Sequence, residues 1–279
     1  MDGVSRRTVH ASQTAANPIY DNPWAYDLAC AFRNVRAEVD ALLGWWPGPG
    51  APGSVLELAA GPAEHAREFA RRGVAATALD LSPAMCAYAA ERAAAEGVPL
   101  EVVRADMTDF SLGRRFDLVV TMLDSTAHLM TLEAFVAHLE RVAGHLTEDG
   151  RYVLEMSHPA DRLTDEPSTG NAWSVERDGV RADVRWGAPG DRLDPITQVV
   201  LEHVTITVTR PDRTEVIQGV VPYRFWTATE LDAAVRLAGS LEIDAQYGDF
   251  TGIGPADPGA WRLITVLRPA TRRTGRGPS

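Results

Sequence analysis

The stretch that decides the fold is VLELAAGPAEHA, residues 55–66. A short apolar run carries the acidic residue Glu57 and leads into a turn of small residues around Gly61, after which a helical pattern begins. Small side chains let a backbone approach a ligand closely, and the start of a helix offers unpaired N–H groups. The stretch therefore predicts a strand, a turn and a helix, with the turn serving either a ligand or plain packing.

The apolar runs that follow also end in polar or small residues. Residues 75–79 lead to Asp80, which lies 19 positions after Gly61, close to the spacing of about 20 expected for a ribose-binding carboxylate. A carboxylate can accept two hydrogen bonds from a vicinal diol. Two later runs lead to residues 106–107 and 123–125. Because parallel strands present their carboxyl ends at one edge of a sheet, we expect these residues to share a site.

Length and composition narrow the class of protein. A chain of 279 residues with 45% hydrophobic residues suits one large α/β domain, alone or with an appendage. The net charge of −11 disfavours a nucleic-acid partner, and no apolar run reaches the ~20 residues of a membrane helix. No apolar segment of a secretory signal follows Arg6 and Arg7, so we expect a cytoplasmic location. Cys30 and Cys86 are interpreted as small buried residues.

Strand and helix patterns alternate through the first half of the chain. Helices are expected over residues 65–72, from Ser82 to Gly97 and from Thr131 to about residue 145, and a fifth strand near residues 152–154. A capping box at residues 227–230 starts another helix, and residues 241–245 and 261–267 predict two closing strands. Such alternation is typical of a doubly wound sheet with helices on both faces.

The two remaining segments have a different pattern. Pro23, with Asn22 as cap, predicts a helix to about residue 46, which either packs on the domain or forms a lid. Short alternating runs after residue 158 predict an antiparallel insert on one edge of the sheet. The expected parts are a tail, lid helix and linker (1–53), a cofactor-binding core (54–157), the insert (158–226), the end of the core sheet (227–268) and a disordered tail (269–279).

Several motifs together resemble the class I S-adenosylmethionine-dependent methyltransferases. The motifs are ELAAGPA (57–63), LDLSPAM (79–85), Asp106-Met107 and FDLVV (116–120). DSTAHL (124–129) is similar to the Asn-Ser-x-x-His-Leu stretch of the small-molecule, glycine-type N-methyltransferases. The resemblance covers residues 54–157, and Ala59 and Ala63 stand where the family usually has glycine. It implies a Rossmann-like, doubly wound, seven-stranded sheet with an N-terminal helical lid and an antiparallel β insert, and S-adenosylmethionine as cofactor.

The resemblance also implies which residues contact the cofactor. Arg33 or Arg36 could hold the carboxylate of the methionine moiety as a bidentate pair. The implied cofactor-binding residues are Tyr20, Tyr26, Arg33, Glu57, Ala59, Gly61, Asp80, Leu81, Asp106, Met107 and Leu123.

Methyl transfer from a sulfonium needs the acceptor to be aligned with the methyl group and water to be excluded. A general base is needed only where the acceptor must lose a proton. His128 and His158, after the fourth and fifth strands, are candidate bases, His128 with a pKa near the working pH; a purely structural role is the alternative. Asp124, Tyr223 and Arg224 are predicted to line the acceptor pocket, or else to serve a turn and packing. The histidine spacing predicts no metal site.

The sequence therefore predicts an enzyme that transfers a methyl group from S-adenosylmethionine to a nitrogen or oxygen of a small-molecule acceptor. All 27 basic residues are arginine, which suggests a GC-rich genome and weakly favours specialised metabolism. The alternatives are a protein that binds the cofactor for other chemistry or as a binding module, a nicotinamide-dependent oxidoreductase, and an RNA or protein methyltransferase. Glu64 in place of a third glycine disfavours the oxidoreductase. An exposed strand of the insert could pair two subunits as a homodimer.

Overall fold

The core of the protein is a seven-stranded sheet with the order β10-β11-β5-β4-β1-β2-β3. The computed structural model describes residues 17–163 and 170–271. Strands β1 to β5 run parallel to one another, whereas β11 is antiparallel to both β5 and β10. The strands are β1 (Ser54–Leu58), β2 (Ala75–Asp80), β3 (Leu100–Arg104), β4 (Phe116–Thr121), β5 (Leu146–Ser157), β10 (Leu241–Tyr247) and β11 (Arg262–Pro269). The predicted seven-stranded, doubly wound sheet is confirmed.

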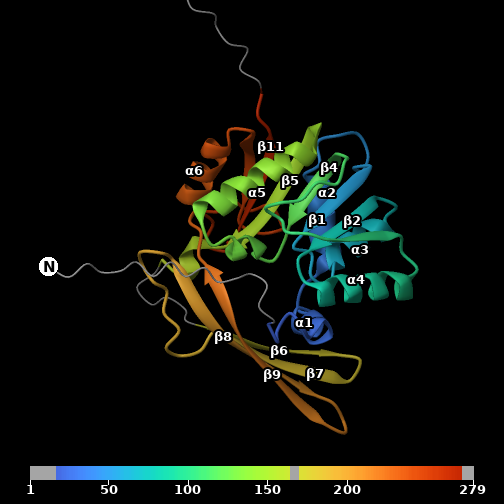
Figure 1. Ribbon diagram of the computed structural model, residues 1–279, viewed down its shortest axis with the longest axis vertical. Helices are drawn as coiled ribbons and strands as arrows, with labels where there is room; N and C mark the ends of the chain where they lie inside the picture. Colours follow the sequence, from blue (N-terminus) through green and yellow to red (C-terminus); the bar gives the residue numbers. More distant parts are fainter. Residues whose placement is uncertain (1–16, 164–169, 272–279) are drawn as a thin grey trace, which may run out of the picture.

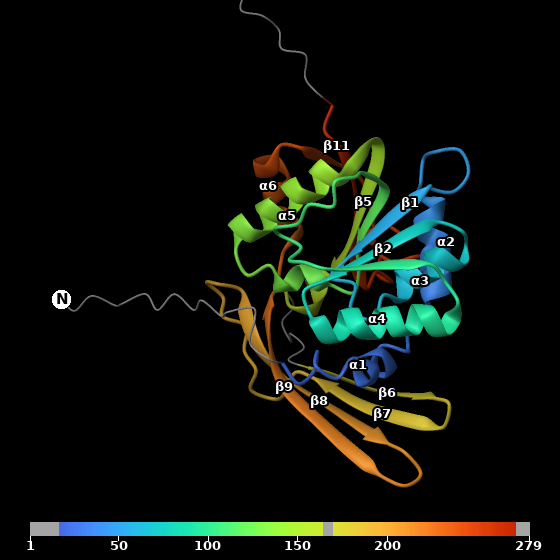
Figure 2. The same cartoon turned by 45° about the vertical axis from the view of Figure 1, so that its right-hand side comes forward.

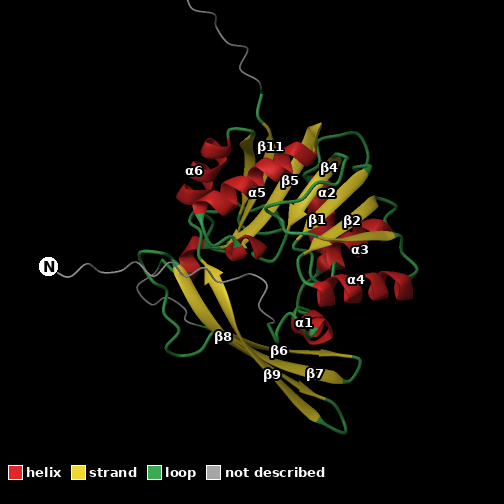
Figure 3. Ribbon diagram, in the orientation of Figure 1, coloured by secondary structure: helices red, strands yellow, loops and turns green. Residues whose placement is uncertain are grey.

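Helices cover both faces of this sheet (Figures 1 and 3). One face packs on α5 (Leu132–His145) and α6 (Ala228–Ala238), where Phe135 is fully buried. The other packs on α2 (Val35–Gly44), α3 (Glu64–Arg71) and α4 (Pro83–Glu96), where Phe69 is fully buried. Burial of one such apolar side chain stabilises the fold by about 1.5–3 kcal/mol. No helix within the described ranges is long and apolar enough to cross a membrane.

The insert forms a sheet of its own rather than an extension of the core sheet. Its strands β6 (Asn171–Arg177), β7 (Val180–Trp186), β8 (Val199–Thr209) and β9 (Thr214–Arg224) are antiparallel and pair in chain order. The antiparallel pattern is confirmed, but the expected place on the edge of the core sheet was wrong. The inner face of the insert instead packs on α1 (Pro23–Ala29) through an apolar cluster, so that α1 lies between the insert and α4 (Figure 2).

The long N-terminal helix expected from residue 23 to 46 is interrupted. Helix α1 ends at Ala29 and α2 begins at Val35, with Asn34 as its N-cap, whose side chain accepts a hydrogen bond from the Ala37 N–H. Arg33 lies in the segment between the two helices and pairs with two buried carboxylates, described below. Tertiary pairing thus overrides the helical pattern of residues 23–46.

Most of the expected helix ends are confirmed. The side chains of Ser82, Thr131 and Thr227 cap α4, α5 and α6, and Glu230 completes the capping box of α6. Asn22 was predicted wrongly as a side-chain cap, because its amide donates to the Pro18 carbonyl oxygen instead. The tails expected before residue 17 and after residue 271 lie outside the described residues.

Two alanines adopt the left-handed backbone conformation that usually requires glycine. Ala59 has φ +49° and Ala63 has φ +57°, on either side of Gly61, whose φ is +52°. These are the two positions where the sequence departs from the usual glycines. A left-handed conformation costs an L-residue roughly 1–2 kcal/mol, and a β-branched side chain more. The turn therefore tolerates alanine, the smallest side chain after glycine, at an energetic cost.

This backbone strain predicts that two substitutions at Ala59 change the free energy of unfolding differently. Ala59→Val should lower the free energy of unfolding by about 2 kcal/mol, since a β-branched residue is poorly accommodated at positive φ. Ala59→Gly should be neutral or stabilise by up to about 1 kcal/mol, because relief of the strain is partly offset by the added freedom of the unfolded chain. Urea unfolding of the two variants measures both effects. A valine variant as stable as the parent would contradict the left-handed turn.

Candidate functional site

A cavity of about 770 Å³ lies at the carboxyl ends of the parallel strands. This volume is within the range of about 300–1,000 Å³ typical of small-molecule sites. Its wall is made by the turn after β1, the end of β2, the connection after β3, the start of η1 (Ser125–His128), the segment before α1 and the end of β9. The predicted site residues that the structure brings together here are Tyr20, Tyr26, Ala59, Gly61, Asp80, Leu81, Asp106, Met107 and His128.

Asp80 joins the turn after β1 to the start of α4. Its Oδ2 accepts the Gly61 N–H at 2.7 Å and its Oδ1 accepts the Ser82 N–H at 2.8 Å. Burial raises the pKa of this carboxyl group, and hydrogen bonds from the backbone N–H groups of Ser82, Gly61 and Leu81 act in the opposite direction. A carboxylate has about four acceptor positions, so the backbone leaves room for a further donor. The carboxylate is thus held in place at the cavity wall, where it can accept a hydrogen bond from a ligand.

Tyr20 and His128 form a pair at another part of the cavity wall. The Tyr20 hydroxyl lies 3.1 Å from His128 Nε2, and the two rings meet edge to face at 86°. His128 also has a hydrogen bond to the backbone of Pro222, which has no N–H, so the imidazole donates to the carbonyl oxygen. The neutral ring has a single N–H, so Nε2 accepts the hydrogen of the Tyr20 hydroxyl.

The predicted pKa of His128 needs correction. Burial lowers the pKa of His128 to about 4, and the hydrogen bond to Pro222 offsets this only partly. The imidazole is therefore neutral at pH 7 and a weak base, contrary to the expectation of a pKa near the working pH. Burial also raises the pKa of the Tyr20 hydroxyl, so the tyrosine stays protonated.

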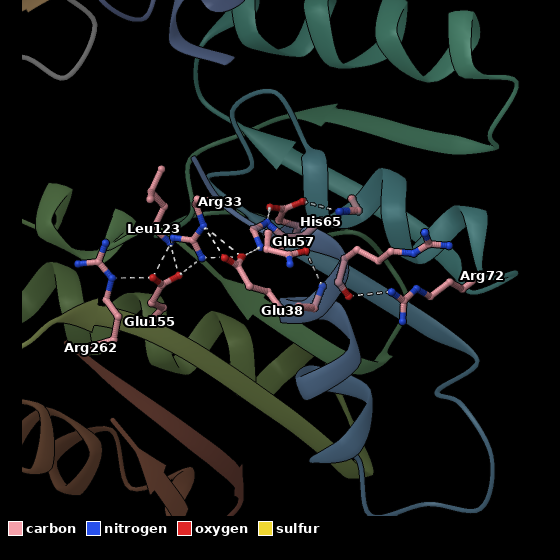
Figure 4. Close-up of polar contacts among 12 residues, drawn as sticks. Arg33, Glu38, Glu57, His65, Arg72, Leu123, Glu155 and Arg262 are labelled. Carbon is pink, nitrogen blue, oxygen red and sulfur yellow. Dashed lines mark hydrogen bonds and ion pairs between the residues drawn. The ribbon is translucent and has the colours of Figure 1, made fainter. Parts of the chain in front are cut away.

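Three predicted cofactor-binding residues, Arg33, Glu57 and Leu123, lie outside the cavity wall. They belong to a buried network of polar contacts (Figure 4). Arg33 donates to Glu38 and, through two nitrogens, to both oxygens of Glu155 at 2.8–2.9 Å. Glu155 also accepts the Leu123 N–H at 2.8 Å and an N–H of Arg262 at 2.8 Å. Arg33 therefore pairs with carboxylates of this chain, which leaves little of its guanidinium for a bidentate contact to a ligand.

Glu57, the third of these residues, lies at the other end of the network. Its Oε2 accepts the Ala66 N–H at 2.8 Å, and its Oε1 lies 3.3 Å from His65 Nδ1. The other ring nitrogen of His65 pairs with Glu38 at 2.8 Å. The carboxylates of Glu38, Glu57 and Glu155 thus face the guanidinium groups of Arg33 and Arg262 and the imidazole of His65. Together these groups fix both the turn after β1 and the loop after β4.

The pKa shifts follow from these contacts. Burial raises the pKa of Glu155, but the charges of Arg33 and Arg262 outweigh it and bring the pKa to about 2. Burial lowers the pKa of His65, but the hydrogen bonds to Glu38 and Glu57 outweigh it and bring the pKa to about 9. His65 is therefore protonated at pH 7, and the network is balanced in charge.

His65 makes stability depend on pH above neutrality. Because the folded pKa of about 9 exceeds the unfolded value of about 6.5, the stabilisation is complete below pH 6.5 and is lost as the pH rises through 9. We expect the parent chain to lose on the order of 2 kcal/mol between pH 6.5 and pH 9, and His65→Gln to show a flatter profile. Urea unfolding at several pH values measures this, and parallel profiles for both chains would contradict it.

The structure does not place the other predicted residues at the cavity. His158 Nε2 donates to the Pro255 carbonyl oxygen at 2.9 Å and Nδ1 accepts the Ala160 N–H, so both ring nitrogens are occupied. Arg224 donates to the Met130 carbonyl oxygen and stacks over Trp226, with its Cζ 3.7 Å from the ring centre. Both residues thus hydrogen-bond to the backbone of this chain, and neither lines the cavity where the predicted base and pocket residue were expected.

Asp124 and Tyr223 lie behind the cavity wall and are joined through Ser157. Asp124 is buried, has φ +57° and accepts a hydrogen bond from the Ser157 hydroxyl. Burial raises the pKa of Asp124 to about 7 despite this bond. The Tyr223 hydroxyl lies 3.2 Å from the same Ser157 oxygen. The chain of three side chains ties β9 to the core sheet, and neither predicted pocket residue lines the cavity.

Sequence reasoning missed several residues of the site. Asp21, Met130 and residues 220–222 line the cavity, although no sequence pattern pointed to them. Asp21 directly follows Tyr20, and Met130 directly follows the DSTAHL stretch, so their neighbours in the sequence could have indicated them. Residues 220–222 carry no motif and reach the cavity only because the insert folds over α1. No group of histidine, cysteine or acidic residues in the described part of the chain could hold a metal ion.

Comparison with known families identifies the core. A family described as a methyltransferase domain matches residues 55–150. Residues 55–150 are thus similar to a methyltransferase domain. The methyltransferase match contains the turn after β1, Asp80, Asp106 and the loop after β4, and so confirms the family predicted from the motifs.

Curated relatives match part of the chain. The chain is 40% identical over 102 residues to a dTDP-3-amino-3,6-dideoxy-alpha-D-glucopyranose N,N-dimethyltransferase of Streptomyces fradiae, covering 37% of this chain and 38% of the relative. It is 34% identical over 103 residues to a dTDP-3-amino-3,4,6-trideoxy-alpha-D-glucopyranose N,N-dimethyltransferase of Streptomyces venezuelae. That match covers 37% of this chain and 41% of the relative. The matches thus span less than half of each relative's length.

Solved structures share the fold over nearly the whole chain. DesVI of Streptomyces venezuelae superposes with a TM-score of 0.71 at 24% identity, covering 88% of this chain and 98% of DesVI. The sugar N-methyltransferase KedS8 from Streptoalloteichus superposes with a TM-score of 0.67 at 23% identity, covering 96% of this chain and 99% of KedS8. At these identities the likeness shows the fold, including the combination of methyltransferase core and added sheet.

Proposed function

We propose that the chain transfers the methyl group of S-adenosylmethionine to an amine nitrogen of a small molecule. The observation that carries the proposal is that one cavity of about 770 Å³ has both the fixed carboxylate of Asp80 and the Tyr20–His128 pair in its wall. Relatives named as N,N-dimethyltransferases of dTDP-linked amino sugars support nitrogen as the acceptor atom. They also support an amino sugar of specialised metabolism as the acceptor class.

The residues of the cavity fit the adenosyl cofactor. A Cβ atom added at Gly61 would lie 3.9 Å from both Met85 Sδ and Tyr26 Cε1, so the bare backbone leaves that part of the cavity open. The Asp80 carboxylate, held by backbone N–H groups, would accept hydrogen bonds from the ribose hydroxyls. Asp106 and Met107 lie on the same wall, where they would flank the adenine. When bound, S-adenosylmethionine supplies an electrophilic methyl group on sulfur, and the electron pair of the broken C–S bond stays on that sulfur.

Tyr20 would orient the acceptor amine. Its hydroxyl hydrogen is donated to His128, so its oxygen is left to accept an N–H of the amine. An acceptor that arrives as an ammonium ion releases a proton to water, and its freed lone pair forms the new N–C bond. The methylated ammonium then releases its proton to water. Neither Tyr20 nor His128 takes up the proton, because Tyr20 stays protonated and His128 is a weak base.

The proposal is tested with pairs of acceptors that differ in a single group. Amino sugars and the matching sugars with a hydroxyl in place of the amine are incubated with the chain and S-adenosylmethionine, and products are identified by mass spectrometry. We expect methyl groups on the amines only, with an equal amount of S-adenosylhomocysteine. Methylation of the alcohols would move the activity to oxygen, and cofactor binding without turnover of any acceptor would favour a binding role.

A further inference from the structure

Two carboxyl groups meet between α1 and the core: the side chains of Asp27 and of Glu64, the first residue of α3, lie within hydrogen-bonding reach of each other. Asp27 is fully buried, and its Oδ2 accepts the Tyr88 hydroxyl hydrogen at 2.8 Å and an N–H of Arg177 at 2.6 Å. Its Oδ1 is also buried, and no N–H or O–H group in the described part of the chain donates to it. This oxygen of Asp27 therefore lacks a donor beside the carboxyl group of Glu64.

Contact between these two carboxyl groups requires a proton on one of them. Two ionised carboxylates repel each other and have no hydrogen to share, whereas a carboxylic acid donates its O–H to a carboxylate. Arg177 and Tyr88 stabilise the ionised form of Asp27 from its other side, so the shared hydrogen belongs to Glu64. Burial and the negative charge of Asp27 raise the pKa of Glu64 to about 7. A hydrogen bond therefore joins the pair below this pH, and two negative charges face each other above it.

The other titratable and charged groups that act on the pair keep their charge between pH 6 and pH 8. Burial raises the pKa of Cys30 to about 12, and burial with the charge of Asp27 raises the pKa of Tyr88 to about 12, so both stay protonated. His65 stays protonated as described above. The arginines that act on the pair come from α3, α4 and β6 and stay positive; they are Arg67, Arg92 and Arg177. Among these groups, Glu64 is the one that titrates in this range.

The pair connects two walls of the cofactor cavity. Asp27 directly follows Tyr26, which lines the cavity, and Glu64 directly follows the turn after β1, in which Gly61 lines it. A Cβ atom added at Gly61 would lie 3.9 Å from Tyr26 Cε1, so the α1 wall packs closely on this turn. The apolar side of α1 packs on the insert, and Asp27 joins the helix to the core through Tyr88 and Glu64. Separation of the two carboxyl groups would therefore loosen α1 from the cofactor turn.

We propose that Asp27 and Glu64 share one proton, and that this pair closes α1 over the cofactor and opens it when the proton is lost. The inference rests on the cofactor site of the proposed function and adds regulation by pH to that site. The pKa of Glu64 in the closed form, about 7, exceeds its ordinary value of 4.5, so protons favour the closed form. A cofactor that binds under α1 also favours the closed form, and its affinity falls as the pH rises through 7.

Calorimetric titration with S-adenosylhomocysteine at pH 6 and pH 8 tests the shared proton without any turnover. We expect the parent chain to bind about 10-fold more weakly at pH 8, because this pH lies one unit above the pKa of Glu64. Glu64→Gln should bind equally at both pH values, since its amide donates an N–H to Asp27 and does not titrate. Glu91→Gln, on the exposed surface of α4, is the matched control and should keep the pH dependence of the parent chain.

The difference between these variants isolates Glu64, because the titration of the ligand and of Asp124, whose pKa burial raises to about 7, is common to all three chains. Parallel pH profiles for the parent chain and Glu64→Gln would overturn the inference. If Glu64→Gln does not fold, Asp27→Asn takes its place, because its amide donates to the ionised Glu64, and a pH dependence like that of the parent chain would again overturn it. Binding that depends on Glu64 in this way, without methylation of any amine, would overturn the proposed function and leave the shared proton standing.

Discussion

Arg33→Ala is expected to lower the free energy of unfolding by about 3 kcal/mol. Arg33 has a side chain that is 2% exposed and bridges Glu38 and Glu155, so its removal leaves two buried carboxylates without their shared partner. Removal of one partner of a buried ion pair lowers the free energy of unfolding by about 3–5 kcal/mol. We expect the lower end of this range, because Arg262 still pairs with Glu155 and His65 still pairs with Glu38.

Two further variants separate the charge of Arg33 from its shape. Arg33→Lys keeps the charge but offers a single nitrogen, which cannot reach both carboxylates as the planar guanidinium does, so it should fall between the parent chain and Arg33→Ala. Arg36→Ala removes an exposed arginine three positions later and should change stability by less than about 0.5 kcal/mol. Urea unfolding at pH 7 measures all three, and equal effects of Arg33→Ala and Arg36→Ala would show that the network contributes nothing.

Tyr20→Phe is expected to lower kcat about 10- to 100-fold with little change in cofactor affinity. The variant keeps the ring and its edge-to-face contact with His128 but loses the oxygen that would accept the amine N–H. Loss of one well-placed hydrogen bond in the transition state corresponds to about 1.4–2.7 kcal/mol. Tyr26→Phe is the matched control, because the Tyr26 hydroxyl bonds to Cys30 and is not assigned to the acceptor.

A second substitution in the pair tests the role of His128. His128→Gln should retain most of the activity, because an amide oxygen can still accept the Tyr20 hydroxyl hydrogen. If His128 were the general base, His128→Gln would be the more damaging change and would remove the acidic limb of the pH–rate profile. Steady-state kinetics between pH 5 and pH 9 distinguish the two roles, and such a loss would restore His128 as the base.

The core sheet and the cofactor side of the cavity could be predicted because their signals are local. The turn after β1, the 19-residue interval to Asp80 and the caps at Ser82 and Thr131 each lie within a short stretch, and the structure has them in the expected elements. Parallel strands then bring their carboxyl ends together without any further information from the sequence.

The buried network could not be predicted because its partners are far apart in the sequence. Arg33 and Glu155 are separated by 122 positions, and their pairing interrupts a helix that the local pattern favours. The pKa of His128 depends on burial beneath residues of the insert, such as Pro222, which no motif marks. His158 was singled out by its place after the fifth strand and Arg224 by its place in the insert, and their hydrogen bonds to backbone carbonyl groups became visible only in the fold.

The most direct test of the account is calorimetric titration of the chain with S-adenosylmethionine, S-adenosylhomocysteine and NAD. We expect micromolar binding of both adenosyl ligands and none of NAD. Asp80→Asn, which keeps the size of the side chain but replaces one acceptor oxygen by a donor, should weaken both at least 10-fold. Asp232→Asn, on the exposed surface of α6, should bind as the parent chain does. Binding of NAD, or adenosyl binding that is unchanged in Asp80→Asn, would contradict the cofactor site at Gly61 and Asp80.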